Sequence, residues 1–141
     1  MELEMRRDCT GVDWQLVMDT LRQVGMGYHR PERHRTAFEN SYAVVFAYDG
    51  VRMIGFGRAV SDGAYQAALY DIAVTTEYQQ KGIGAAIVGD ILERLPAACN
   101  IILYAMPGRE GFYGKRGFRR MKTAMARFVR AELMQEKGFT D

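Results

Sequence analysis

The chain has 141 residues, of which 48% are apolar and 26% are charged, and its formal net charge is +2 at pH 7. These values are ordinary for a globular protein and allow one domain, 1–141, with a hydrophobic core. The small net charge gives no reason to expect a nucleic-acid partner. No apolar stretch approaches the ~20 residues of a membrane span, so no membrane partner is expected.

Cysteine usage bears on metal binding and on the compartment. Cys9 and Cys99 form no CxxC pair and have no histidine companions, so we expect no metal site and two reduced thiols. Residues 1–7 lack the apolar core of a secretion signal. The expected location is therefore the cytoplasm.

The first 40 residues predict a strand and two helices. Residues 2–7 alternate weakly, as in a strand. Asp13 is a candidate N-cap for a helix that continues to about Met26, because apolar residues recur there at helical spacing. Residues 28–40 are polar and rich in histidine and arginine, and Pro31 fits the first turn of a second helix.

The middle of the chain predicts an antiparallel meander. Its β-prone segments are residues 42–48, 51–60 and 67–75. Asp49-Gly50 is a two-residue hairpin signal, and Asp62-Gly63 is a second turn signal. We assign Arg58 to the second hairpin, together with Asp62 as a turn residue.

The second half predicts a helix at 82–95, a buried strand at 101–106, a short helix at 110–116 and a strand that begins at Phe118. Residues 121–135 fit both a strand and an amphipathic helix, and the choice stays open. The connection from 67–75 to 101–106 should be a right-handed crossover between parallel strands. The fold class is therefore α+β, with helices covering a mixed sheet.

Residues 74–84 carry the most informative pattern. They lead from the third meander strand into Gly82 and Gly84, where a helix begins. The first turn of a helix has unpartnered N–H donors, and its dipole favours negative charge. Glycines let a ligand approach the backbone closely. This segment therefore predicts a site for a phosphorylated ligand.

Two common phosphate loops do not match this segment. The P-loop needs four residues between its glycines, whereas Gly82 and Gly84 are separated by one. The dinucleotide fingerprint GxGxxG would place its third small residue at Ile87. The early meander also argues against a doubly wound parallel sheet.

The spacing Gln79-x-x-Gly82-x-Gly84 resembles the pyrophosphate loop of the GNAT superfamily of acyl-CoA N-acyltransferases. About thirty residues later, 113–118 is similar to the family's Y-x-K-x-G-F segment, with one strand between the two motifs. The resemblance covers residues 42–120 well and the first 40 only in the order of elements. The chain is thus identified as a small single-domain member of bacterial type.

The resemblance implies an N-acetyltransferase that moves the acetyl group of acetyl-CoA to a primary amine; a small molecule is favoured as the acceptor over a protein terminus or lysine. It implies a mainly antiparallel sheet with helices on both faces and a splayed parallel strand pair, in which the pantetheine arm pairs with the strand backbone. A backbone N–H near Ala73 or Val74 would stabilise the oxyanion. The implied cofactor-binding residues are Ile72, Ala73, Val74, Gln79, Gln80, Lys81, Gly82, Ile83, Gly84, Ala85, Tyr113 and Lys115.

The resemblance implies that Tyr113 protonates the departing thiolate, since a phenol and a CoA thiolate are similarly basic. The general base stays open between Tyr70 and Asp71. These neighbours should point to opposite faces of their strand, with Tyr70 on the face of Val74, unless a bulge near Ala73 changes the alternation.

Several alternatives stay open. Many relatives carry Asn where this chain has Met106, and Tyr113 also fits a packing aromatic. A solvated charged face is favoured over an acceptor site for the basic residues between the first helices, His29, Arg30, Arg33, His34 and Arg35. The alternative function is a non-catalytic acyl-CoA-binding regulatory module, and a basic nucleic-acid-binding domain is a third. Homodimers are common in the family, so a dimer is not excluded.

Overall fold

The computed structural model describes residues 1–141 as two compact units, Met1–Leu103 and Tyr104–Asp141. The first unit contains β1 (Leu3–Arg6), α1 (Trp14–Gln23), α2 (Pro31–Glu39), β2 (Ala43–Asp49), β3 (Arg52–Ser61), β4 (Gln66–Val74), the 3-10 turn η1 (Thr76–Tyr78), α3 (Ile83–Arg94) and β5 (Asn100–Ile102). The second contains α4 (Glu110–Gly114) and α5 (Ala131–Glu136). No helix of the chain has the length and hydropathy needed to cross a membrane.

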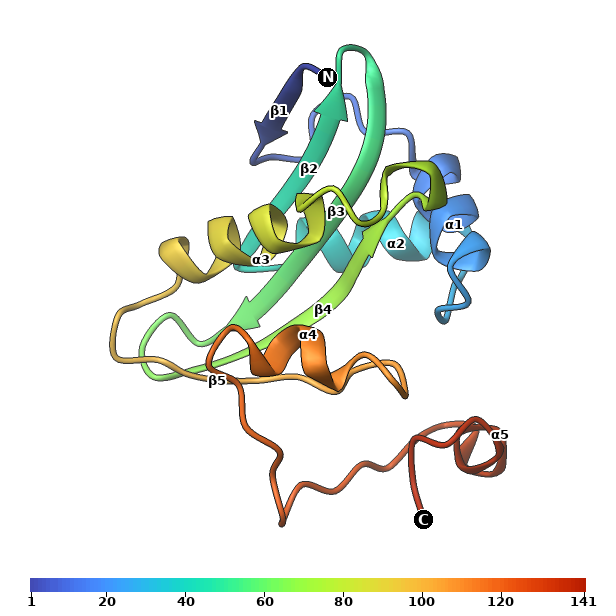
Figure 1. Cartoon of the computed structure of the whole chain (residues 1–141), viewed down its shortest axis with the longest axis vertical. Coiled ribbons are helices and arrows are strands. Elements are labelled where there is room, and N and C mark those ends of the chain that lie inside the picture. Colours follow the sequence, from blue (N-terminus) through green and yellow to red (C-terminus); the bar gives the residue numbers. More distant parts are fainter. The chain divides into compact units, whose positions relative to one another are not determined.

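The first unit is a five-stranded sheet with the order β1-β2-β3-β4-β5. Its neighbours are antiparallel except for β4 and β5, which are parallel. The helix α3 covers one face, and α1 and α2 cover the other (Figure 1). This arrangement confirms the predicted α+β class. Because β5 pairs only with residues 66–68, the rest of β4 has no β5 partner.

The ends of the first elements follow local signals in the sequence. The Asp13 carboxylate accepts the Leu16 N–H at 3.2 Å and caps α1, and Pro31 is the first residue of α2. The β2–β3 turn lies one residue later than predicted, since Asp49 pairs with Arg52 and Gly50 has a φ of +59°. A side chain at Gly50 would be strained in this conformation.

The core between the sheet and the α1–α2 layer is aromatic. Phe38 from α2 contacts Trp14, Phe46 and Phe56, with ring centroids 5.4–5.9 Å apart. Phe38, Phe46 and Phe56 are at most 1% exposed. Offset and edge contacts between buried rings stabilise a fold beyond the area that they bury. This cluster holds α2 against β3, which matters for the site below.

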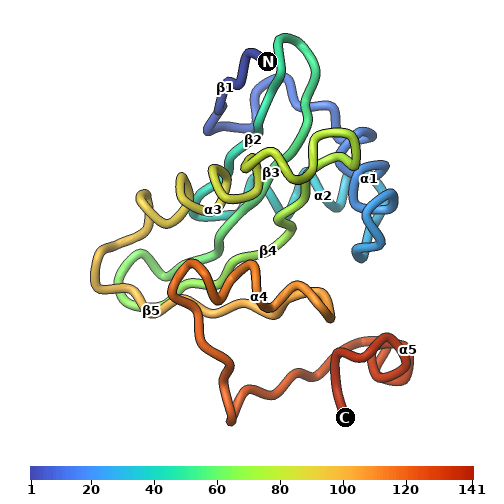
Figure 2. Tube along the Cα trace, viewed as in Figure 1, coloured from blue at the N-terminus to red at the C-terminus, as the bar shows by residue number.

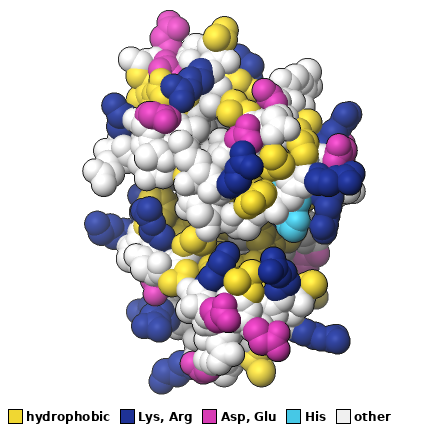
Figure 3. All heavy atoms as spheres, turned by 90° about the vertical axis from the view of Figure 1, so that its right-hand side faces the viewer, with side chains coloured by type: hydrophobic (Ala, Val, Ile, Leu, Met, Phe, Trp, Pro, Cys, Tyr) yellow, Lys and Arg dark blue, Asp and Glu magenta, His cyan; other side chains and the backbone are white.

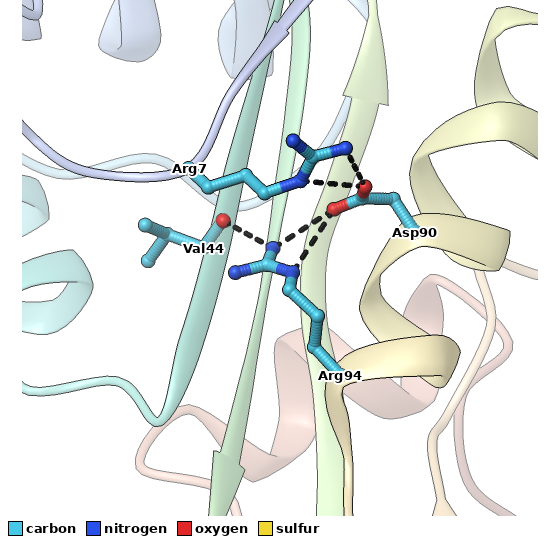
Figure 4. A network of polar contacts seen from close by, with 4 residues as sticks. All are labelled: Arg7, Val44, Asp90 and Arg94. Carbon is cyan, nitrogen blue, oxygen red and sulfur yellow. Dashed lines mark hydrogen bonds and ion pairs between the residues drawn. The ribbon is translucent and has the colours of Figure 1, made fainter.

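A polar network ties α3 to β2 and to Arg7, which follows β1 (Figure 4). Asp90 on α3 accepts from Arg7 at 2.6 Å and from Arg94 at 2.9 Å. Arg94 also donates to the Val44 carbonyl of β2. Because the Asp90 side chain is only 10% exposed, its two arginine partners offset the loss of hydration.

The second unit differs from the prediction. No strand begins at Phe118, and residues 118–130 run without regular structure before α5 (Figure 2). A strand needs hydrogen-bonded neighbours, and Met125 and Val129 in this segment are fully exposed. The strand predicted at 101–106 shortens to β5 and is not buried. T-shaped contacts of Tyr104 with Phe128 and Phe139, at 5.5 and 5.9 Å, hold the tail.

Candidate active site

The loop between β4 and α3 presents backbone N–H groups. Gln80 and Gly82 have left-handed φ values of +63° and +82°, and Gly82 caps α3 without any side-chain hydrogen bond. The first turn of α3 therefore lacks a capping acceptor. The Ala86 N–H donates to the Gly82 carbonyl, and this bond begins the helix. Left-handed residues in such loops form concave sets of N–H groups that bind anions. The geometry suits a phosphate.

Two glutamine side chains hold the start of this loop in place. Gln79 donates through Nε2 to the Val74 carbonyl at 3.1 Å. At the end of α1, Gln23 Oε1 accepts the Thr76 N–H at 3.3 Å. Gln79, the glutamine of the motif, thus binds a backbone carbonyl at the end of β4. It does not occupy the N–H groups of the loop, which stay available to a ligand.

Tyr78 ties the same loop to the β2–β3 hairpin. Its hydroxyl donates to Asp49 Oδ2 at 2.6 Å. This hydrogen bond lowers the pKa of Asp49 and raises the pKa of Tyr78, because it favours the charged carboxylate and the neutral phenol. The Glu2 N–H also donates to Asp49 and lowers that pKa further. Tyr78 is therefore a structural tether of the loop.

The free part of β4 contains a β-bulge. Ala73 pairs with Phe56 and Tyr70 pairs with Arg58, so Asp71 and Ile72 together oppose one residue of β3. Asp71 has a φ of +55°, which is uncommon for a residue with a side chain. The bulge lies one to two residues before Ala73, close to the position considered from the sequence.

The bulge overturns the predicted alternation of side chains. Ile72 points toward α3, where its Cδ1 would stand 2.6 Å from a Cβ on Gly57. Tyr70 instead lies beside Arg58, whose Cζ is 5.1 Å from the Tyr70 ring centroid and 5.6 Å from that of Phe38. Asp71 reaches the same arginine. The prediction that Tyr70 and Asp71 point to opposite faces, with Tyr70 on the face of Val74, is therefore wrong.

Arg58 and Asp71 form a largely buried ion pair. Arg58 Nε donates to Asp71 Oδ2 at 2.7 Å, and the two side chains are 16% and 20% exposed. Arg58 also donates to Ser41 Oγ at 3.4 Å. The attraction within such a pair is largely offset by the cost of removing both charges from water, so its main effect is to fix the orientation of the guanidinium and the carboxylate. Arg58 pairs with Tyr70 in the β3–β4 hairpin, as predicted, and it also belongs to this site. Asp62 acts as the predicted turn residue.

His34 is the buried member of the basic group between α1 and α2. It is 3% exposed, and its Nε2 accepts the His29 N–H at 2.9 Å. Burial lowers the pKa of His34, and the nearby Asp71 carboxylate opposes that effect. A solvated face, as favoured from the sequence, is wrong for His34. His29 is exposed, and histidine atoms reach the surface beside basic side chains in Figure 3.

The free edge of β4 fits an extended ligand. Its backbone beyond Ala68 is not paired with β5, and Thr75 follows directly. Thr75 is 5% exposed, yet its hydroxyl oxygen has no hydrogen-bond partner. Buried polar atoms are nearly always partnered, so this edge suits a molecule that supplies one. The predicted residues Ile72, Ala73 and Val74 lie on this edge.

Tyr113 and Lys115 belong to the second unit. Tyr113 lies on α4 between Phe112 and Phe118, with ring centroids 4.9 and 5.9 Å away. Burial raises the pKa of Tyr113, against the smaller opposing effects of Arg116 and Arg109. The phenol therefore keeps its proton at neutral pH. Lys115 is exposed at the end of α4.

Sequence reasoning missed Arg58 and undervalued His34. The alternation of β3 places Arg58 on the face of the buried Phe56, which is the signal that was available. No comparable signal marked His34, because its partner is a backbone N–H. No group of three His, Cys, Asp or Glu side chains is arranged to hold a metal ion.

The mostly antiparallel sheet with its parallel β4–β5 pair, flanked by helices, matches the fold of the GNAT acetyltransferases. Residues 13–131 match the family model described as acetyltransferase (GNAT) domain. The chain therefore belongs to the GNAT acetyltransferase family.

Known proteins agree with this assignment. The chain is 34% identical to serotonin N-acetyltransferase 2, chloroplastic, of Oryza sativa over 121 residues, and 29% identical to GCN5-related N-acetyltransferase 1, chloroplastic, of Arabidopsis thaliana over 118. Each alignment covers 81% of this chain and 60% of the relative. The chain thus spans well under two thirds of their length. A probable acetyltransferase from Staphylococcus aureus shares the fold, with a TM-score of 0.80, 22% identity, and coverage of 91% of this chain and 98% of that one.

Proposed function

We propose that this protein is an N-acetyltransferase that transfers the acetyl group of acetyl-CoA to a primary amine of a small molecule. One observation supports it above the others: an uncapped N-terminus of α3 follows directly on the free edge of β4. The first feature suits a pyrophosphate and the second suits the extended pantetheine arm. Both features lie in the first unit and are adjacent, so a single acetyl-CoA molecule could contact both.

On the donor side, the backbone N–H groups of residues 80–85 bind the pyrophosphate, and exposed Lys81 adds a cation toward the phosphates. The pantetheine arm pairs with the backbone of Ile72, Ala73 and Val74. A backbone N–H at Ala73 or Val74 donates to the thioester oxygen as it becomes negative. Backbone donors fixed by a strand and a helix need no rearrangement during the reaction.

On the acceptor side, the neutral amine nitrogen attacks the thioester carbon, and the carbon–sulfur bond breaks. The amine proton passes to the Asp71 carboxylate, directly or through water, with Tyr70 lining the pocket. Asp71 has one carboxylate oxygen engaged by Arg58, so the other oxygen serves the proton. Tyr113 gives its proton to the leaving thiolate and regains one from solvent.

The name of the rice relative makes serotonin the first acceptor to test. Acetyl-CoA with a panel of aryl, alkyl and polyamine acceptors should release free CoA, measured by thiol titration, and CoA should raise the melting temperature. CoA binding without turnover of any amine would favour the regulatory module. A melting temperature that acetyl-CoA leaves unchanged would refute the proposal. The cytoplasmic location stays a prediction.

A further inference from the structure

The segment between α1 and α2, residues 24–30, is attached at both ends. At its start, Gln23 of α1 accepts the N–H of Thr76, just beyond β4. At its end, the His29 N–H donates to His34 Nε2. The segment therefore borders the carboxyl end of β4, where the reacting thioester is proposed to lie. We call residues 24–30 the α1–α2 segment.

The attachment at His34 sets the state of its ring. An N–H donor needs a lone pair, so Nε2 is unprotonated and the ring proton is on Nδ1. The ring is 3% exposed. His34 is therefore a hydrogen-bond acceptor toward the segment, with no lone pair left to act as a base. Protonation of Nε2 would remove the bond.

The groups that face His34 come from three elements. Asp71 of β4 favours its charged form, whereas Arg58 of β3 and His29 of the α1–α2 segment disfavour it. The His29 and His34 ring centroids are 5.6 Å apart, and Arg33 contacts His29 Nδ1 at 3.4 Å. A single buried ring is thus hydrogen-bonded to the segment that borders β4 and lies within electrostatic reach of the Arg58–Asp71 pair.

We propose that His34 is a positioning residue for the amine acceptor: its Nε2 holds the α1–α2 segment to α2, so that the segment forms one wall of the acceptor site on the side of Asp71. The proposal rests on the amine acetyltransferase function above. It makes His34 act on acceptor binding and not on the acetyl-CoA loop, which Gln79 and Tyr78 hold separately.

Three variants test this role. His34→Leu removes the nitrogen that accepts the His29 N–H, and His34→Gln offers an amide oxygen in its place. His29→Gln alters the side chain of the donor residue but keeps its backbone N–H. In His34→Leu we expect the KM for the amine to rise about tenfold, with the KM for acetyl-CoA unchanged. In His34→Gln and His29→Gln we expect the KM for the amine to stay within about threefold of the wild type.

Amide hydrogen exchange of residues 28–34 gives a readout that needs no turnover. It should quicken in His34→Leu and not in His29→Gln, while CoA still raises the melting temperature of all three variants. Unchanged exchange in His34→Leu would overturn the proposal even if no amine were found. Faster exchange with an unaltered amine KM would also overturn it. Failure of the wild type to bind acetyl-CoA would instead refute the proposed function.

Discussion

The donor and acceptor sides of the candidate site are built from different groups. The donor side consists of backbone: the loop of residues 79–85 and the free edge of β4. The proposed acceptor side consists of side chains on the α1–α2 face: Arg58 contacts Asp71 and Tyr70, and His34 lies within electrostatic reach of Arg58 and Asp71. A backbone site tolerates most sequence changes but demands particular φ values, whereas a side-chain site changes specificity with single substitutions.

The largest effect is expected at the proposed general acid. Tyr113→Phe removes the proton donor and should lower kcat about 100-fold or more, with the Kd for CoA unchanged. Phe112→Leu is the matched control, because it loosens the same ring contact without removing a hydroxyl. Turnover by Tyr113→Phe at the wild-type rate would leave Tyr113 as a packing residue.

The acceptor side is tested next, with Asp71→Asn. Asparagine tolerates the left-handed conformation and can still accept from Arg58, so the bulge should persist. Without the carboxylate, kcat/KM for the amine should fall about 100-fold, and CoA affinity by isothermal calorimetry should not change. A loss of CoA affinity instead would show that the two sides are not separable.

The donor side is tested with Gly82→Val. A β-branched residue cannot adopt a φ of +82° without strain, so the loop should deform and the Kd for CoA should rise at least about tenfold. Gly89→Ala on α3 is the control, since a Cβ there meets nothing within 4 Å. Its CoA affinity should match the wild type, and a Gly82→Val variant that binds CoA normally would argue against the loop.

A pair of glycines on β3 tests how tightly α3 holds the β4 edge. A Cβ at Gly55 would stand 2.9 Å from the Ala73 carbonyl oxygen, which is backbone, so Gly55→Ala should lower the free energy of unfolding by about 1–3 kcal/mol. At Gly57 a Cβ would stand 2.6 Å from Ile72 Cδ1 and 2.9 Å from Ile87 Cγ2, which are both side-chain atoms. Gly57→Ala should therefore be the milder change by urea denaturation, and the reverse order would contradict the packing.

The smallest effect is expected from pH. Burial lowers the pKa of His34 in the folded chain below its ordinary value of about 6.5. The unfolded chain then binds this proton at higher pH than the folded chain, so the free energy of unfolding falls as pH drops from about 6.5 toward the lowered pKa. The free energy of unfolding, measured by urea denaturation at several pH values across this window, should depend less on pH in His34→Gln than in the wild type. Equal slopes would remove His34 from the acid response.

Local patterns predicted most of the first unit. Asp13 and Pro31 marked helix starts, and Gly50 marked a hairpin, because caps and turns depend on residues a few positions apart. The motif from Gln79 to Gly84 predicted the proposed donor side from spacing of the same short range. The second unit was less predictable, since the state of residues 118–130 depends on whether a neighbouring strand is present.

Sequence alone determined the order of elements as far as α4 and the family, and it predicted the loop of residues 79–85 as a phosphate site, because all of these depend on short-range spacing. Only the tertiary structure decided the acceptor side. The bulge at Asp71 changes which face of the sheet the side chains of β4 point to. The packing of α2 places His34 within electrostatic reach of the Arg58–Asp71 pair. The bulge comes from strand pairing and the cluster from packing across many residues, and neither has a local pattern in the chain.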